Sequence, residues 1–193
     1  MQKLPIAPAP LSPAQGVVAY PAQHRLFESG ADGTAWRVCN GVIRLDKISQ
    51  DGGSDYAGLA IRSDILGCET LLLGQYCFRA TSLTPCTLTP WPDDASSDPV
   101  RLIDSLNQAQ RRAAQLIALR GGQAVERVIQ LIKLLVDGEG RVILPTRQDI
   151  ADITDLRFET VSRLIHGLVR DRVLSPIRID GIHATRSFTL NPA

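Results

Sequence analysis

The sequence of 193 residues has no long apolar run, no excess of charge of either sign and none of the short motifs of the common enzyme classes. Its most apolar stretch, residues 128–136, is interrupted by Gln130 and Lys133, so no membrane span of about 20 apolar residues is expected. Lys plus Arg number 21 and Asp plus Glu number 20, so overall charge does not suggest a nucleic-acid binder. Because no P-loop, GxSxG or HExxH sequence occurs, we do not expect an enzyme.

Patterns typical of metal centres and disulfides are also scarce. The four cysteines (Cys39, Cys68, Cys77 and Cys86) contain no CxxC pair, and only three histidines are present. Since the chain opens without the apolar leader of an exported protein, we expect reduced thiols and a cytoplasmic location. The histidines are not grouped as metal ligands, so neither a metal nor another cofactor is expected.

The first half of the chain consists of short strand-like runs separated by turn residues. Four of the twelve prolines fall within residues 1–16, which predicts an extended arm. Asn40-Gly41 is a strong turn signal, and residues 49–55 form a polar, Gly-rich loop. The strand candidates are residues 36–38, 42–45, 59–61, 65–66, 76–80 and 86–88. Many short strands at close intervals predict a jelly-roll sheet domain over residues 1–98.

A long helix should follow this domain, over residues 99–121. Asp98 suits an N-cap and Pro99 suits the first helical position, while Gly121-Gly122 ends the pattern. Apolar residues recur at spacings of four, three, four and three residues: Leu102, Leu106, Ala109, Ala113 and Leu116. The spacing is that of a coiled-coil seam, but it equally fits an amphipathic helix lying on its own domain. Periodicity alone leaves both interpretations open.

The remaining residues, 122–193, predict a small helical domain with a hairpin. A helix is expected over residues 125–136 and a short strand over 141–144. Thr146 caps the next helix, with Asp149 three residues on, and a turn at 154–157 leads into a helix over 158–170. This layout is a helix-turn-helix. A hairpin on Asp180-Gly181 would form its wing, where Arg178 and Arg186 either touch phosphates or are solvated. The fold class is therefore α+β.

The helix at 158–170 carries its polar residues on one face. At 100° per residue, five of them fall within an arc of about 100°: Glu159, Ser162, Arg163, His166 and Arg170. Arg163 can bond the O6 and N7 atoms of guanine, and Glu159 can accept from the amino group of cytosine, while Ser162 permits close approach. A carboxylate facing DNA suits base reading and not phosphate binding. Phe158 should lie on the flank facing the domain core.

The segment 146–152 followed by Glu159-Thr160-Val161-Ser162-Arg163 resembles the CRP/FNR superfamily of bacterial transcription regulators. The upstream order of β-roll, long helix, second helix and winged helix-turn-helix is also that of the family, whose β-roll resembles cyclic-nucleotide-binding domains. The resemblance covers residues 20–190 approximately. It implies that the long helix is a dimer interface. Double-stranded DNA, a second copy of the chain and RNA polymerase are the partners it implies.

The resemblance also implies roles for particular residues. Glu159, Ser162 and Arg163 match the family's base-reading positions. The residues expected to touch the DNA backbone are Thr146, Arg147, Gln148, Thr160, His166 and Arg170. Because an apolar residue, Phe158, stands where the CRP branch has an arginine, the helix is similar to that of the FNR branch. The implied half-site is TTGAT, in a palindrome of the form TTGAT-N4-ATCAA, and not TGTGA.

Whether the roll senses an effector stays open. Gly67-Cys68-Glu69 differs by one inserted residue from the family's cyclic-nucleotide motif, and the register of Arg79 does not match the phosphate-binding arginine. An iron–sulfur cluster would need grouped cysteines near the N-terminus, and residues 1–38 have none. His24 is the only histidine before the DNA-binding domain, which disfavours haem. The alternative to a regulator controlled by its abundance is a ligand- or redox-sensing regulator whose roll binds an effector.

Overall fold

The computed structural model describes residues 16–92 and 99–191. The predicted arm, apart from Gly16, and the Asp98 cap lie outside these residues, as does the side chain of Leu102. The strands are β1 (Val18–Tyr20), β2 (Arg25–Phe27), β3 (Ala35–Asn40), β4 (Ile43–Ile48), β5 (Ser54–Ala60), β6 (Ile65–Leu66), β7 (Arg79–Ser82), β8 (Cys86–Trp91), β9 (Arg141–Ile143), β10 (Leu174–Pro176) and β11 (Ser187–Leu190). The helices are α1 (Thr70–Leu73), α2 (Pro99–Ala118), α3 (Ala124–Leu135), α4 (Arg147–Thr154) and α5 (Phe158–Arg170), with a 3-10 turn, η2 (Ala184–Arg186).

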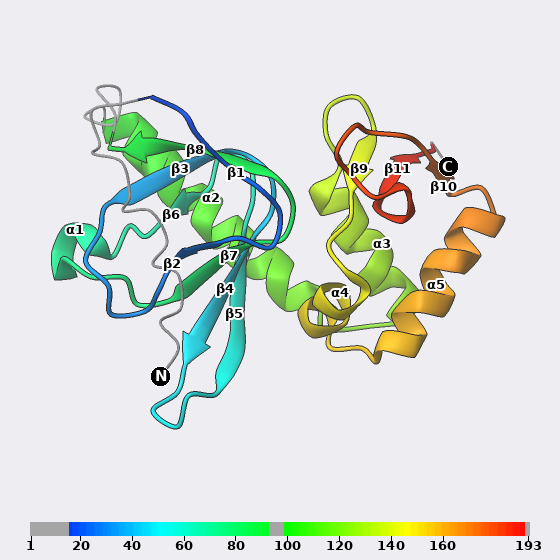
Figure 1. The fold of residues 1–193 in the computed structure, drawn as a ribbon, viewed down its shortest axis with the longest axis horizontal. Helices are drawn as coiled ribbons and strands as arrows, with labels where there is room; N and C mark the ends of the chain where they lie inside the picture. The colour runs from blue at the N-terminus through cyan, green and yellow to red at the C-terminus, as the bar shows by residue number, and fades with distance from the viewer. Residues whose placement is uncertain (1–15, 93–98, 192–193) are drawn as a thin grey trace, which may run out of the picture.

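The strands β1–β8 form a β-roll of two four-stranded sheets, with orders β1-β8-β3-β6 and β2-β7-β4-β5 (Figure 1). The described pairs in both sheets are antiparallel. One cluster of buried residues unites them, because it draws Trp36 and Leu88 from the first sheet and Ile43 and Ala80 from the second. The predicted jelly-roll-like arrangement of strands is confirmed for the described residues.

The chain crosses from one sheet to the other at Asn40-Gly41. Gly41 has φ +95°, and a Cβ there would overlap Cys86, so only glycine fits. The predicted turn is present, but β3 pairs with β8 and β6, whereas β4 pairs with β5 and β7. The local sequence predicts the turn, but it does not predict which sheet each flanking strand joins.

The ring of Tyr76 fills the interior of the roll beside α1. It stacks on Phe27 with 3.6 Å between ring centroids and an interplanar angle of 7°. Its hydroxyl donates to the carbonyl oxygen of Thr34 at 2.7 Å and accepts from Nε1 of Trp36 at 3.3 Å. The ring leaves no room for a Cβ on Gly33 or Gly67. Tyr76 is thus a packed and hydrogen-bonded part of the core.

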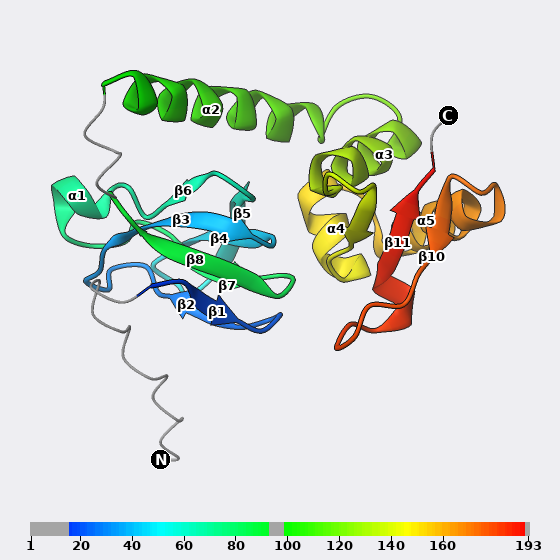
Figure 2. The same ribbon diagram turned by 90° about the horizontal axis from the view of Figure 1, so that it is seen from above.

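The elements α3, α4, α5 and β9–β11 form a helical module with its own small sheet, ordered β10-β11-β9. Figure 2 shows α2 running along one side of the roll toward this module. A second apolar cluster is continuous across both parts, since it joins Leu59 and Leu83 of the roll to Leu119 and to Ile132 and Ile165 of the module. The roll and the module therefore share a buried core.

Gly33 gives a test of the packing around Tyr76. Gly33→Ala should lower the free energy of unfolding by about 1–3 kcal/mol, because the added methyl group overpacks the core. Gly58→Ala is the control, since a Cβ there meets only Cδ1 of Leu116 at an ordinary 3.7 Å. Urea denaturation measures both. Equal stabilities of the two variants would contradict this account of the roll.

Candidate nucleic-acid interface

The polar arc of α5 is displayed on the surface as the sequence predicts. Val161, Ile165 and Leu168 are buried and anchor the helix, while Glu159, Arg163 and His166 are exposed and Ser162 is half-buried. Among the described residues, none forms a hydrogen bond or an ion pair with the side chain of Glu159, Ser162 or Arg163. The three predicted base readers therefore share one accessible face with free donors and acceptors.

Phe158 differs from the expectation. Its side chain is 46% exposed, so the prediction that it faces the domain core is wrong. It is the first residue of α5, and no preceding helical turn covers it. The residue stands beside Glu159 at the amino end of the helix.

The amino end of α4 brings together several residues predicted to touch the DNA backbone. Thr146 and Asp149 form a reciprocal capping box, in which Oδ2 of Asp149 accepts from the backbone nitrogen of Thr146 at 3.1 Å. Arg147 is half-buried and donates to the carbonyl oxygen of Thr185 at 3.3 Å. Burial, and then the positive charge of Arg186, lower the pKa of Arg147. Two neighbouring cations at a helix amino end favour an anion such as phosphate.

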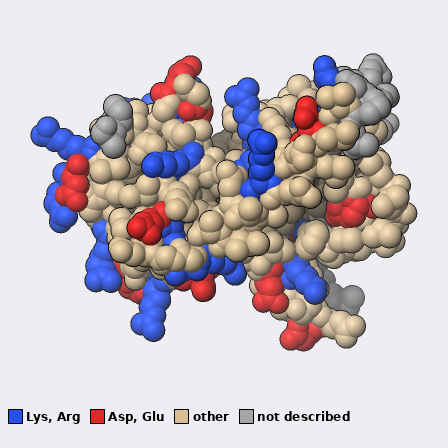
Figure 3. Space-filling view, turned by 180° about the vertical axis from the view of Figure 1, so that it is seen from behind, with Lys and Arg blue, Asp and Glu red and all other residues tan. Residues whose placement is uncertain are grey.

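The other predicted backbone residues have different surroundings. Nε2 of Gln148 donates to Oδ1 of Asp152 at 2.8 Å, and Arg170 pairs with Asp171 at 2.9 Å on the open surface. Thr160 is half-buried. Arg186 is not merely solvated, because it donates to the carbonyl oxygens of Leu144 and Leu83, each at 2.7 Å. Lys and Arg side chains stand out along the edge of the helical module (left in Figure 3).

The predicted seam on α2 is only partly exposed. Ala109 and Ala113 are exposed and Leu106 is 60% exposed, but Leu116 packs against the core shared by roll and module. Ile103 and Ile117 are exposed instead, the latter by 75%. The exposed apolar residues thus include Ile103, Leu106, Ala109, Ala113 and Ile117, a face that is rotated from the predicted one because Leu116 has turned inward.

Comparisons with known proteins find transcription regulators that are similar to this chain. No family model matches the chain. It is 28% identical over 180 residues to the nitrogen fixation regulation protein FixK of Rhizobium meliloti (strain 1021), covering 90% of this chain and 84% of that protein. It is 29% identical over 195 residues to the transcriptional activatory protein AadR of Rhodopseudomonas palustris, covering 86% and 81%. The resemblance to transcription regulators of the CRP/FNR family therefore extends over most of the chain.

Solved structures show the same fold. FixK2 of Bradyrhizobium japonicum superposes with a TM-score of 0.66 at 21% identity, covering 92% of each chain. A transcriptional regulator of the CRP family from Thermus thermophilus gives a TM-score of 0.67 at 20% identity, covering 90% of this chain and 92% of that one. The predicted α+β fold is therefore confirmed, and the regulators matched in sequence support the predicted family resemblance. In the described part of the chain, no helix is both long and apolar enough to cross a membrane.

In the roll, the segment Gly67-Cys68-Glu69 makes contacts with other parts of the same domain. Oε1 of Glu69 accepts from the backbone nitrogen of Cys77 at 3.1 Å, and Arg79 pairs with Glu28 at 2.7 Å. Cys68 and Cys77 are exposed free thiols. The described residues contain no group of three or more potential metal ligands.

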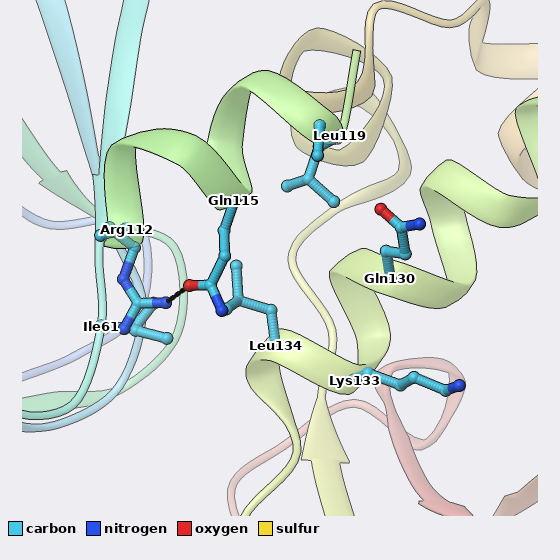
Figure 4. A pocket seen from close by; sticks show the side chains of 8 residues that line it. Ile61, Arg112, Gln115, Leu119, Gln130, Lys133 and Leu134 are labelled. Atoms are coloured by element: carbon cyan, nitrogen blue, oxygen red, sulfur yellow. Dashed lines mark hydrogen bonds between the residues drawn. The ribbon is translucent and has the colours of Figure 1, made fainter. Parts of the chain in front are cut away.

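An open cleft of about 430 Å³ lies between α2 and α3 (Figure 4). Its floor is apolar, with Leu119 and Leu134, and Arg112 stands at one end. That guanidinium already pairs with Asp64 at 2.8 Å and donates to Gln115 at 2.7 Å. The cleft marks where the long helix meets the module.

Sequence reasoning missed the arginines that hold α4. Arg120 donates to the carbonyl oxygens of Ile153 and Asp152, and Arg127 to those of Thr154 and Asp155. Arg44, from β4, pairs with Asp152 at 2.6 Å although 108 positions separate them. No local sequence pattern predicts an ion pair between residues so far apart in the chain. Residues 99–136 carry six basic and two acidic side chains, and this local excess is the only sign of Arg120 and Arg127 in the sequence.

Thr146 tests the capping of α4. Thr146→Ala should lower the free energy of unfolding by about 1 kcal/mol, because the backbone nitrogen of Asp149 loses its side-chain acceptor. Thr146→Ser keeps the hydroxyl and should remain close to wild type in the same urea titration. Two variants of equal stability would show that the cap contributes little.

Proposed function

We propose that this regulator binds DNA as a homodimer, on a palindrome of the type TTGAT-N4-ATCAA. The observation that carries the proposal is the free polar arc of α5, where Glu159, Ser162 and Arg163 have no partner among the described residues. In the proposed complex, Arg163 bonds guanine and Glu159 accepts from the cytosine paired with it or from an adjacent amino group. The amino end of α4 and the residues His166 and Arg170 face the backbone.

We assign a separate role to each of three parts of the chain. Residues 1–98 form a sensor-like roll with an arm, residues 99–121 the dimerisation helix, and residues 122–193 the winged helix-turn-helix. The exposed apolar face of α2 supports self-association, because a solvated row of isoleucine and leucine side chains is unfavourable in water. A regulator of this kind acts beside promoters, so we propose RNA polymerase as a further partner and the cytoplasm as its location.

Two arginines separate base reading from backbone binding. Arg163→Ala should cost about 1–3 kcal/mol on the palindrome and relax discrimination at the guanine. Arg147→Ala should weaken binding to all sequences alike and reduce the salt dependence of the affinity. Gel-shift titrations on palindromic and random duplexes at several salt concentrations measure both effects. If wild-type protein shows no preference for the palindrome over random DNA, the proposed function is wrong.

A charge in the α2 face should abolish dimerisation. Leu106→Glu or Ala113→Glu places a carboxylate opposite its own copy in a desolvated interface. Light scattering should then report monomers, and binding to the palindrome should collapse because two recognition helices must stand about 34 Å apart. Leu72→Glu is the matched control, since Leu72 is 91% exposed in α1, away from α2. A Leu106→Glu protein that stays dimeric refutes the interface.

Phe158 tests the half-site. Phe158→Arg should shift preference toward TGTGA, because an arginine at this position can bond a further guanine. Selection from randomised half-sites reads the preference directly, and an unchanged melting temperature shows that the helix is intact. Enrichment of TGTGA by wild-type protein would contradict the proposed half-site.

A further inference from the structure

Two arginines from different elements stack on one tyrosine where the roll, the long helix and the module meet. The guanidinium carbon of Arg120 lies 4.8 Å from the ring centroid of Tyr56, and that of Arg44 lies 5.6 Å from it. Tyr56 belongs to β5, Arg44 to β4, and Arg120 follows α2. Guanidinium groups at these distances are attracted by the ring's electron-rich faces.

Both arginines also hold the same residue of α4. Nη1 of Arg44 contacts Oδ2 of Asp152 at 2.6 Å, while Nη2 of Arg120 donates to the carbonyl oxygen of Asp152 at 2.9 Å. Arg44 is further fixed by Asp46, at 2.7 Å. Its side chain is only 15% exposed, so solvent screens these ion pairs less than it would on the surface. One residue of α4 is therefore tied to the roll and to the long helix together.

The hydroxyl of Tyr56 takes no part in these contacts. It is buried and has no hydrogen-bond partner among the described residues. Burial raises the pKa of Tyr56 to about 12, although the charges of Arg120 and Arg44 oppose the shift. The phenol is thus neutral at physiological pH, and the ring alone performs the stacking.

We propose that the stack of Arg44, Tyr56 and Arg120 sets the separation of half-sites that the dimer accepts. The inference rests on the proposed function. In it, Arg44, Tyr56 and Arg120 are positioning residues, because they orient α4 without touching DNA. The long helix defines the two-fold axis, and α5 packs on α4. Fixing α4 against the end of α2 therefore fixes where each recognition helix stands relative to the axis.

The spacing of half-sites is sensitive to this orientation. One added base pair moves the second half-site by about 3.4 Å and rotates it by about 34° around the duplex. A module held at one angle cannot follow that displacement, whereas a module released from the roll and the long helix can. Arg127 cannot replace the stack, because it lies in α3 within the same module and moves with α4.

The test compares palindromes with three, four and five base pairs between TTGAT and ATCAA. Wild-type protein should prefer one spacing by about tenfold or more. Tyr56→Leu and Arg44→Gln should reduce that preference by about fivefold, the magnitude of a lost cation–π contact. Both variants should still bind TTGAT more tightly than a half-site in which the guanine is replaced by another base. Tyr56→Phe keeps the ring and should retain the wild-type preference.

Arg79→Gln is the matched control for Arg44→Gln, since it removes an ion pair to Glu28 in the same sheet without touching α4. The melting temperature of each variant is measured to show that it is folded. The comparison of Tyr56→Phe with Tyr56→Leu tests the role of the ring without changing Arg44. Unchanged spacing preference in Tyr56→Leu, or equal loss in Tyr56→Phe, overturns the inference. Higher affinity of Arg44→Gln at all spacings would do so too, because the stack would then restrain binding. Absence of any wild-type preference for TTGAT would instead overturn the proposed function.

Discussion

The carbonyl groups at the carboxyl end of α4 need hydrogen-bond donors, and arginines from other elements supply them. A helix leaves its last carbonyls without partners inside the helix, and cations are favoured there. Arg120 and Arg127 meet this requirement from the end of α2 and from α3. Because α5 follows α4 through a tight turn, the placement of the recognition helix depends on how α4 is held.

The helical module was the most predictable part of the chain. Its signals are local: the reciprocal cap of Thr146 and Asp149, and an apolar stripe on each helix. The predicted boundaries of α3, α4 and α5 accordingly match to within a residue or two. In the wing, the short strands β10 and β11 pair on either side of Asp180-Gly181, and η2 precedes β11. Periodicity over only a few residues did not predict η2.

The roll was predictable as a type of fold but not in its pairing. Its strands join residues far apart in sequence, so the turn at Asn40-Gly41 could not reveal the crossing between sheets. The helix α1 was missed because four residues are too few for a periodic signal. The network around Arg44 is similar, since the side chains that contact it come from distant elements. Such contacts follow from tertiary packing alone.

The apolar residues of α2 can pack either against the roll or against a second chain, and the sequence does not show which of them do which. Leu116 satisfies the heptad spacing, yet the roll offers it a packed environment and the helix turns Ile117 outward. A helix can carry two apolar faces when one packs against its own domain and the other packs against a second chain. The face that remains solvated in one chain is the better guide to association.

The free arc of α5 and the occupied amino end of α4 have a kinetic consequence for the proposed interface. Glu159 and Arg163 can enter the major groove without first breaking an internal bond. Gln148 and Arg147 must exchange Asp152 and the carbonyl of Thr185 for phosphate. Initial, sequence-independent encounters therefore gain less from these two side chains than their exposure suggests. In the proposed complex, a larger share of the residence time on DNA would then depend on the bases, and dissociation from unrelated sequences would be fast.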